Sequence, residues 1–507
     1  MSLALLLVVV CALEAWLVQG KTLLAPQAQG GLDPVVDLVL RFGFDLLAFG
    51  ALTGLLPRLL VAAAFVAAVV FYVFVLVYHD YFQQPLSILI VLNQRREGAL
   101  VTDAGFALLR PWHLLFVGTL ALKLLLLFSA ADSTPTLHTG LLCAGLYLLA
   151  LLVVNRVYKP LAKIATWETV GGLGAVYGYL PAWAAEYAFI DSKALLVRAL
   201  ARAGETSDRL TPIETPAPVA DRVVFLQVES LDWAVLDFRI RGEEVTPAIN
   251  RHARRGMTYA VQADKRTGSL DADFTMLMGR PPSADVPTYK IQGYPYAGSL
   301  IQRLRELGFA TTSVHGVSGE FFSRRPAFEK MGFDRLIFRE EFERMAAAPV
   351  AGWSVPDDDL LQFAAMDFSA QSGRQFQLAI TATSHIPFHN YDRTLARFFP
   401  GSASIAENYF DVIHYVDRAV GRYLDALPQE TTVVLYGDHV SKVEHEGLGY
   451  RQAMWGGVGL VPFIVLETGR DLSRLQRTGA ESRDGHLTLL DTVTWLHASV
   501  DLLRDIP

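Results

Sequence analysis

"TVVLYGDHVSK", residues 432–442, begins with β-branched and apolar residues and changes character at Gly437. Asp438 and His439 follow the glycine side by side. An apolar run of this length, bounded by a glycine, predicts a buried strand that ends by presenting a carboxylate and an imidazole. The pair is either a polar turn or one half of a metal site, and a metal site would need further ligands from elsewhere in the chain.

Four other segments after residue 220 have the same strand-like composition. They are 222–230 ("RVVFLQVES"), 309–316 ("FATTSVHG"), 376–384 ("FQLAITATS") and 458–467 ("VGLVPFIVLE"). Helical patterns separate the strands, for example at 299–308 and 406–427. Strands that alternate with helices predict an α/β domain with a mostly parallel sheet and helices on both faces.

Polar side chains stand at the ends of four of these strands, where ligands bind in such sheets. They are Glu229, Ser230, His315, Ser384, His385, Asp438 and His439. Taken singly, each is most simply a solvated or helix-capping residue. Together, Glu229, Asp438 and His439 offer two carboxylates and an imidazole without a thiol, which suits Mn²⁺, Mg²⁺ or Zn²⁺. Such a site could activate a hydroxyl and stabilise charge on a phosphoryl oxygen.

The segment 264–279 ("DKRTGSLDADFTMLMG") supplies the candidate hydroxyl. Thr267 and Ser269 flank a glycine there, directly before a predicted helix. A nucleophile at a helix N-terminus gains from backbone N–H groups aimed at an anion. The simpler alternative is a capping segment, with Ser269 or Asp271 as the N-cap.

The first third of the chain is strongly apolar. The protein has 507 residues, of which 52% are hydrophobic and 19% charged, and its mean hydropathy is +0.30. Runs of about 20 apolar residues are long enough to cross a bilayer. They predict about five membrane spans, near residues 3–19, 35–56, 59–79, 113–131 and 138–155. A cleaved signal peptide is the alternative for the first run, which lacks a basic start and a small-x-small cleavage site.

These patterns predict a transmembrane domain at 1–158, a partly helical, interfacial linker at 159–218 and a catalytic domain at 219–507. Both cysteines fall inside predicted spans, so the remainder has neither disulfides nor a thiolate nucleophile. A net charge of −7 without long basic runs argues against nucleic acid as a partner.

Four ionisable residues lie inside the predicted spans, namely Glu14, Arg41, Asp45 and Lys123. Charges within a membrane usually pair with one another or face a cavity. A structural ion pair, or placement near a span end, is the simpler interpretation. The alternative is a polar track for a lipid head group.

Several motifs, in this order, resemble those of the lipoteichoic acid synthase-like phosphoglycerol transferases of the sulfatase and alkaline phosphatase superfamily. They are "QVESLDW", "GSLDADF", "HGVSGEFFSRR", "TSHIPF" and "YGDH". The resemblance implies one divalent cation, usually Mn²⁺, held by Glu229, Ser269, Asp438 and His439. It selects Ser269 rather than Thr267 as the nucleophile, although the family usually has threonine there.

The same resemblance implies the residues that bind the substrate. Arg324 stands where the family has its phosphate-binding arginine, and Phe322 stands where the family has a tryptophan in the head-group pocket. His385 matches the family's substrate histidine, with a role in stabilising the phosphoryl group or protonating the leaving oxygen.

The implied reaction has two steps. Ser269 attacks the phosphate of phosphatidylglycerol, diacylglycerol leaves, and a glycan or glycerol-phosphate polymer then takes the phosphoglycerol from the serine. The implied location is the bacterial inner (cell) membrane, multi-pass, with the catalytic domain on the extracytoplasmic face. The alternatives are a phosphoethanolamine transferase, a related lipid phosphodiesterase or phosphatase, and a non-catalytic lipid sensor. A strict sulfatase is excluded because no C/S-x-P-x-R segment stands at the nucleophile.

Overall fold

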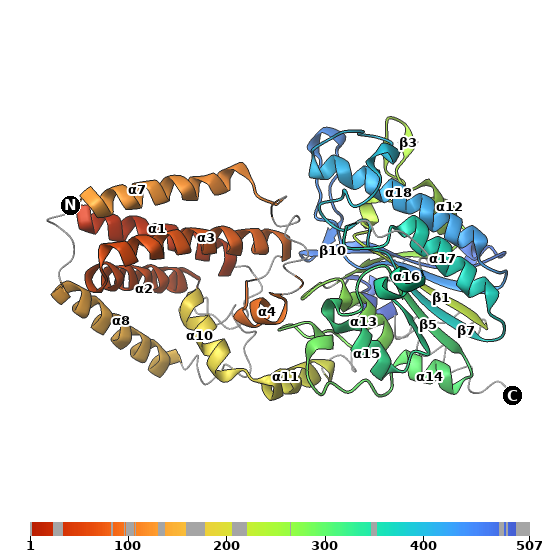
Figure 1. Cartoon of the computed structure of the whole chain (residues 1–507), viewed down its shortest axis with the longest axis horizontal. Coiled ribbons are helices and arrows are strands. Elements are labelled where there is room, and N and C mark those ends of the chain that lie inside the picture. The colour runs from red at the N-terminus through yellow and green to blue at the C-terminus, as the bar shows by residue number, and fades with distance from the viewer. Residues whose placement is uncertain are drawn as a thin grey trace. The chain divides into compact units, whose positions relative to one another are not determined.

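The computed structural model divides mainly into two compact units, a helical unit that ends at Arg198 and an α/β unit that follows it (Figure 1). Each unit is described by itself. The structure describes residues 3–23, 34–82, 85–95, 97, 106, 108–129, 137–158, 178–204, 221–263, 265–345, 352–475, 481–482 and 485–492.

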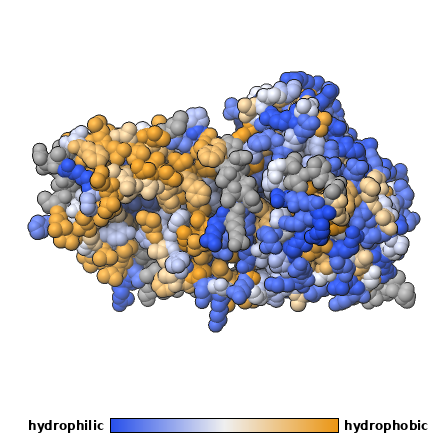
Figure 2. Space-filling model, viewed as in Figure 1, coloured by the Kyte–Doolittle hydropathy of each residue, from blue (hydrophilic) through white to orange (hydrophobic). Residues whose placement is uncertain are grey.

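Long apolar helices build the helical unit: α1 (Leu3–Leu23), α2 (Pro34–Leu55), α3 (Arg58–Phe82), α7 (Leu115–Ser129) and α8 (Leu137–Tyr158). Among the described residues, four stretches are long and apolar enough to cross a membrane: Leu3–Thr22, Arg58–Asp80, Pro111–Ser129 and Leu137–Arg156. Helix α2, with 22 residues, lies at the remaining predicted span. Figure 2 shows apolar residues gathered over this unit and hydrophilic ones over the α/β unit.

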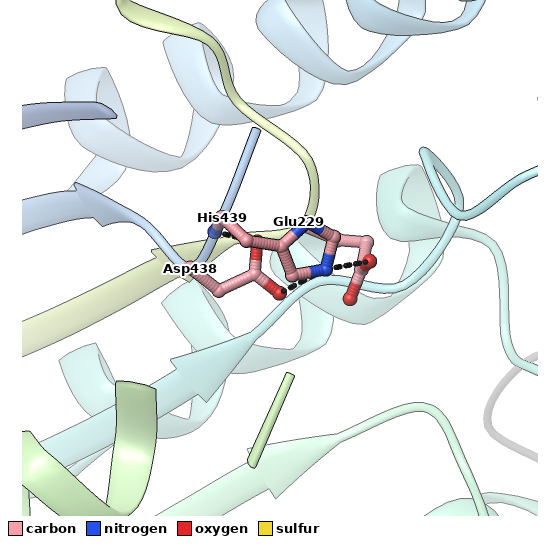
Figure 3. A group of neighbouring side chains, drawn as sticks. All are labelled: Glu229, Asp438 and His439. Carbon is pink, nitrogen blue, oxygen red and sulfur yellow. Dashed lines mark hydrogen bonds and ion pairs between the residues drawn. The ribbon is translucent and has the colours of Figure 1, made fainter. Parts of the chain in front are cut away.

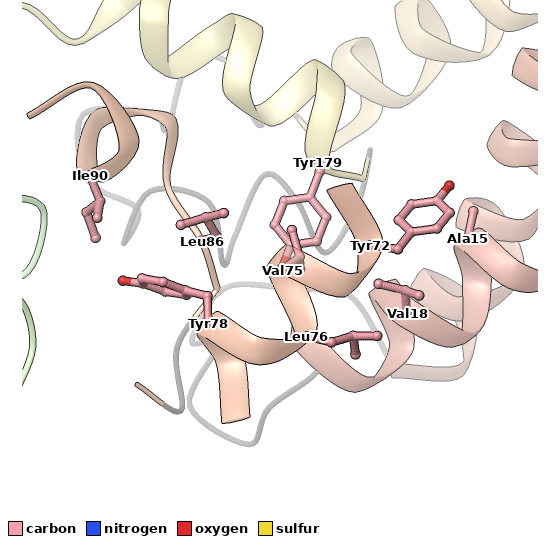
Figure 4. Packing of buried hydrophobic residues seen from close by; sticks show 9 residues of the cluster. All are labelled: Ala15, Val18, Tyr72, Val75, Leu76, Tyr78, Leu86, Ile90 and Tyr179. Atoms are coloured by element: carbon pink, nitrogen blue, oxygen red, sulfur yellow. The ribbon is translucent and has the colours of Figure 1, made fainter. Parts of the chain in front are cut away.

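Shorter helices complete the helical unit: α4 (Ile88–Asn93), the 3₁₀ turn η1 (Pro111–Leu114) and α10 (Tyr179–Phe189). Tyr179 of α10 packs into a buried cluster with Val18 of α1 and Leu76 of α3 (Figure 4). Helix α10 falls within residues 159–218, for which the sequence predicted a partly helical, interfacial linker. Helix α11 (Ser192–Gly204) follows it.

The ionisable residues inside the predicted spans have polar partners within the bundle. Lys123 of α7 forms a buried ion pair with Glu14 of α1, and Thr119 also donates to this carboxylate at 2.5 Å. The side-chain amide of Gln19 donates to Asp45 at 3.2 Å. The structural ion pair expected from the sequence is therefore present.

The α/β unit is built on an eight-stranded sheet in the order β4-β10-β8-β1-β7-β5-β6, with β9 paired to β10. The strands are β1 (Arg222–Val228), β4 (Met257–Gln262), β5 (Ala310–His315), β6 (Arg335–Ile337), β7 (Gln375–Ile380), β8 (Thr431–Gly437), β9 (Met454–Trp455) and β10 (Val458–Glu467). Two short hairpins lie outside it: β2 (Arg239–Ile240) with β3 (Glu243–Glu244), and β11 (Glu481–Ser482) with β12 (Gly485–His486).

Strands β6, β5, β7, β1 and β8 run parallel to one another, whereas β10 is antiparallel to both β8 and β4. The five predicted strands are all present, and the predicted α/β fold class is confirmed. Strands β4, β6 and β9 were not predicted. A hairpin turn at Gly456–Gly457, with φ of 55° and 81°, joins β9 to β10.

Helices cover both faces of the sheet, which is why its central strands are buried almost throughout. Helices α12 (Pro247–Ala253), α17 (Asp357–Ala370) and α18 (Ile405–Ala426) pack against one another on one side. On the other side lie α13 (Leu270–Met278), α14 (Leu300–Glu306) and α15 (Arg324–Met331) (Figure 1), and α16 (Arg339–Met345) follows β6. Because β1, β5, β7 and β8 are parallel, their carboxyl ends meet at one edge.

Candidate active site

The ends of β1 and β8 bring Glu229, Asp438 and His439 together (Figure 3). One ligand atom from each lies within 4.8 Å of the others, and all three side chains are buried. Nε2 of His439 lies 3.1 Å from Oε1 of Glu229 and 3.5 Å from Oδ2 of Asp438. The three predicted metal ligands therefore converge, as the strand-end pattern suggested.

The backbone of Glu229 is held by hydroxyls from the loop after the neighbouring strand β7. Its N–H donates to Oγ1 of Thr381 at 2.9 Å, and its carbonyl accepts from Oγ of Ser384 at 2.6 Å. The next residue, Ser230, has a φ of 54°, in the left-handed region that non-glycine residues rarely adopt. Backbone strain of this kind concentrates at functional sites, where the surrounding contacts maintain it.

Two features of this cluster fit a divalent cation. Oδ1 of Asp438 accepts from the N–H groups of Ser230 and His439, but its buried Oδ2 accepts no hydrogen bond from the described part of the chain. A buried carboxylate oxygen without a partner is costly, and a cation would satisfy it. Nδ1 of His439 lies 2.9 Å from the carbonyl of Val440, so the proton belongs on Nδ1 and the Nε2 lone pair faces the carboxylates.

Burial governs the protonation of these groups. Burial, and then the nearby Glu229 carboxylate, raises the pKa of Asp438 well above its usual value. Burial, and then the ammonium of Lys265, lowers the pKa of His439 to about 4. The imidazole is therefore neutral at neutral pH, which is the form that binds metals.

Asp271 organises the loop that carries Ser269. Its Oδ2 accepts from the N–H groups of Arg266, Thr267 and Gly268 at 2.8, 2.6 and 3.4 Å, and its Oδ1 accepts from the Thr267 hydroxyl at 2.8 Å. Ser269 stands at the start of α13, where its side chain makes no capping hydrogen bond. Ser269 is therefore the N-cap of α13 by position but not through a side-chain hydrogen bond, and Asp271 accepts from the other candidate hydroxyl, that of Thr267.

The loop 265–269 adjoins the ligand cluster. Nε2 of Gln227, two residues before Glu229, donates to the carbonyl of Ser269 at 3.3 Å. Nζ of Lys265 lies 2.8 Å from Nε2 of His439. Lys265 was not predicted as a site residue. Lys265 lies in the segment 264–279, which supplies the candidate nucleophile, but no sequence motif distinguishes it there from a surface lysine.

Arg324 forms a buried ion pair with Asp273. Its Nε and Nη2 donate to Oδ2 of Asp273 at 3.0 and 2.8 Å, and its Nη1 lies 3.3 Å from Nε2 of His315. Tyr289 donates to the other oxygen of Asp273. Asp273 follows Ser269 by four residues, so both lie on the same side of α13. Phosphate binding by Arg324 stays a prediction, and its partner Asp273 was not anticipated.

A row of aromatic side chains in contact extends from the loop 265–269 to His385. The ring of Phe322 lies against Gly268, since a Cβ on that glycine would be 2.7 Å from Cζ of Phe322. Ring contacts continue from Phe322 to Phe321 (4.5 Å between centroids), from Phe321 to Trp353 (5.6 Å), and from Trp353 to His385 (5.0 Å). Phe322 and His385, both predicted substrate residues, thus belong to one aromatic row.

The fold and this cluster define the class of the protein. Residues 221–494 match the sulfatase family, and the chain belongs to that family. The match covers the α/β unit that holds the cluster, in agreement with the superfamily inferred from the motifs.

Within this family, the chain is similar to proteins named lipoteichoic acid synthase. The chain is 22% identical to lipoteichoic acid synthase 2 of Bacillus subtilis (strain 168) over 396 residues, which are 72% of this chain and 60% of that protein. It is also 22% identical to the lipoteichoic acid synthase of Staphylococcus saprophyticus, over 55% of this chain and 47% of that protein. The chain spans about half the length of the curated relatives it matches.

Among solved structures, the chain is similar to lipooligosaccharide phosphoethanolamine transferase A (EptA) of Neisseria meningitidis, an integral membrane protein. The TM-score is 0.53 at 14% identity, and the match covers 97% of this chain and 95% of that one. This likeness supports the layout of a helical unit followed by an α/β unit.

Proposed function

We propose that this protein is a metal-dependent phosphoglycerol transferase that uses phosphatidylglycerol as its donor. The observation that carries the proposal is the convergence of Glu229, Asp438 and His439 beside the loop of Ser269 in a sulfatase-family unit. The relatives named lipoteichoic acid synthase support phosphoglycerol as the transferred group. Helices apolar enough to span a membrane suit an enzyme whose donor is a lipid.

Glu229, Asp438, His439 and the hydroxyl of Ser269 would hold one divalent cation, Mn²⁺ foremost and Mg²⁺ or Zn²⁺ as alternatives. When bound, such an ion supplies charge stabilisation for a phosphoryl oxygen and lowers the pKa of a coordinated hydroxyl. The buried, unsatisfied Oδ2 of Asp438 and the neutral imidazole of His439 support this assignment.

In the first half-reaction, Oγ of Ser269 attacks the phosphorus and the bond from phosphorus to the diacylglycerol oxygen breaks. The Ser269 hydroxyl loses its proton to solvent, and His385 passes a proton from solvent to the leaving oxygen, so diacylglycerol departs as an alcohol and a glycerophosphoryl-serine remains. Arg324, held by Asp273, pairs with phosphate oxygens through its Nη1 side, and Phe322 borders the head group.

In the second half-reaction, an acceptor hydroxyl attacks the same phosphorus and loses its proton, and the bond to Ser269 Oγ breaks as that oxygen takes up a proton and becomes a hydroxyl again. The acceptor is a glycan or a glycerol-phosphate polymer, and the reaction takes place at the bacterial inner (cell) membrane with the α/β unit on the extracytoplasmic face. A lipid donor and a cell-envelope acceptor meet on that face, which supports this location.

The test uses the full chain purified in detergent, head-group-labelled phosphatidylglycerol and Mn²⁺, and compares the wild type with Ser269→Ala. Release of diacylglycerol that needs the metal and is lost in Ser269→Ala, with the label retained on wild-type protein, is the expected result. Thr267→Val is the matched control, because Thr267 carries the other hydroxyl of the loop and should leave release intact.

A folded, metal-loaded wild type that releases no diacylglycerol from phosphatidylglycerol would refute this donor. Release from phosphatidylethanolamine in the same assay would then support a phosphoethanolamine transferase. No turnover of either lipid, with lipid still bound, would support the non-catalytic sensor.

A further inference from the structure

Lys265 contacts the one atom of His439 that a metal ion would need. Its Nζ lies 2.8 Å from Nε2, and the carbonyl of Val440 on the far side of the ring assigns the proton to Nδ1. Nε2 therefore has a single lone pair, directed at the ammonium. That lone pair cannot accept a hydrogen bond from Lys265 and coordinate a cation simultaneously. The lysine and the metal ion exclude each other at this atom.

The charges around His439 also favour competition between Lys265 and a metal ion. The same Nε2 lies 3.1 Å from Glu229 and 3.5 Å from Asp438, so the Lys265 ammonium that contacts it lies close to two buried acidic side chains. An ammonium at this place partly neutralises the ligand set that attracts a dication. A dication and an ammonium a few ångströms apart in a buried site also repel each other strongly.

The lysine is anchored next to the predicted nucleophile. It precedes by one residue the three N–H groups, 266–268, that Asp271 holds, and Ser269 follows them directly. The backbone on that side is therefore fixed, whereas the four-carbon stem of a lysine is flexible. An ammonium released from His439 stays within the neighbourhood of Ser269, where the phosphate of the donor must lie for attack.

We propose that His439 exchanges Lys265 for the divalent cation, so that metal binding releases the ammonium to a phosphate oxygen of the donor. The first half of this proposal, the exchange at His439, rests only on the contact between Lys265 and His439. The second half, in which the released ammonium binds phosphate, rests on the phosphoryl transfer proposed above. Lys265 thereby couples metal binding to phosphate binding. The coupling makes the enzyme's phosphate site complete only when the ion is present.

Metal affinity tests the exchange without any turnover. Mn²⁺ is titrated by calorimetry into EDTA-treated full-length protein in detergent, for the wild type, Lys265→Met and Lys442→Met. Lys265→Met should bind Mn²⁺ more tightly by about 5- to 150-fold, the usual range for coupled sites. Lys442 is the control because it interacts electrostatically with Lys265 but does not contact His439, and its pKa is lowered to about 7 by burial and then by Lys265. In a titration at pH 6, where Lys442 is mostly charged, the effect of Lys442→Met should be clearly smaller than that of Lys265→Met.

The second arm measures inorganic phosphate binding to the Mn²⁺-loaded proteins. Lys265→Met should weaken it by about tenfold or more, the loss expected for one charge-assisted hydrogen bond. Lys265→Gln, which keeps a donor without the charge, guards against a packing defect, and circular dichroism checks that each variant is folded. Lys265→Gln should bind Mn²⁺ more tightly than the wild type, as Lys265→Met does.

Several results would overturn the proposal. Unchanged or weaker Mn²⁺ binding in folded Lys265→Met refutes the exchange, as does an equal gain in Lys442→Met, which would reveal a general charge effect. Tighter Mn²⁺ binding with unchanged phosphate binding refutes the second half only. If the transferase assay fails with either donor lipid, the Mn²⁺ titration still tests the exchange independently.

Discussion

At the scale of single residues, Asp271 determines the shape of the nucleophile loop. Its carboxylate accepts four hydrogen bonds, three of them from consecutive backbone N–H groups, and it lies buried at the start of α13. Such bonds to a charged acceptor shape a loop that has no regular structure of its own. The position of Ser269 therefore depends on a residue that takes no part in the chemistry.

Asp271→Ala should lower the free energy of unfolding by about 1–3 kcal/mol, because buried N–H groups lose their acceptor. It should lower the rate of diacylglycerol release by about 100-fold, since a nucleophile displaced by about 1 Å loses its alignment. Denaturant unfolding and the lipid assay measure the two effects. Thr267→Val removes only the hydroxyl donor and should cost much less in both; equal losses in the two variants would contradict this role.

The raised pKa of Asp438 gives metal binding a pH dependence. Because this carboxyl keeps its proton to an unusually high pH, protons compete with Mn²⁺ more strongly as the pH falls. Mn²⁺ affinity should increase from pH 6 to pH 8, by no more than about tenfold per pH unit for one released proton. Calorimetry at the two pH values measures it, and Asp438→Asn should flatten the profile. A flat wild-type profile would show that Asp438 is already ionised.

At the scale of elements, the turn η5 (Phe321–Ser323) packs closely against the loop that precedes α13. Phe322 and Ser323 are consecutive non-glycine residues in the left-handed region, with φ of 55° and 60°. This strained turn presses the Phe322 ring onto Gly268, where no side chain fits. The contact joins the loop 265–269 to the segment that carries Arg324, so it limits how far apart the proposed nucleophile Ser269 and the proposed phosphate-binding Arg324 can move.

Gly268→Ala should therefore displace the Phe322 ring. We expect a loss of about 1–3 kcal/mol in stability, as for other overpacked sites, and a fall in diacylglycerol release. The double variant Gly268→Ala with Phe322→Leu removes the clash and should recover part of the stability relative to additivity, a coupling of about 0.5–3 kcal/mol. Strict additivity in the double-mutant cycle would show that the ring does not press on the glycine.

At the scale of the whole molecule, the proposed metal site predicts that a bound cation stabilises the α/β unit. The cluster joins β1 to β8 at one edge of the sheet, and a cation held there binds the folded chain but not the unfolded one. Mn²⁺ at about 100 times its Kd should stabilise the protein by about 2.7 kcal/mol. EDTA should lower the Tm accordingly, in a thermal melt of the wild type. Glu229→Gln is the control, and its Tm should respond little to EDTA.

The helical unit offers a separate test through its buried ion pair. Lys123→Leu leaves Glu14 as an uncompensated buried charge and should destabilise the unit by about 3–5 kcal/mol, whereas Lys123→Leu with Glu14→Leu should be close to neutral. Thermal melts in detergent compare the variants. If the double variant is folded but has lost lipid turnover, the pair belongs to a polar track for the head group rather than to the architecture.

Local sequence determined much of this protein. The strands β1, β5, β7, β8 and β10 were predictable because apolar runs bounded by turn residues favour buried strands wherever they occur. The convergence of Glu229, Asp438 and His439 was predictable because parallel strands deliver their carboxyl ends to one edge. Long apolar helices followed from composition and length alone. The strands and helices depend on neighbours within a few residues, whereas the convergence of the three side chains follows from the general geometry of parallel sheets.

Only the tertiary structure decided the remaining pairings. Lys265 meets His439 across 174 residues of sequence, and Arg324 meets Asp273 across 51, and no local pattern indicates either partner. The direction of β10 likewise depends on the hairpin at Gly456–Gly457 and on the two strands between which it inserts. The physical reason is common to all three: a hydrogen bond or ion pair between distant residues forms only once the sheet has brought its strands into register, whereas secondary structure forms from each segment's own side chains.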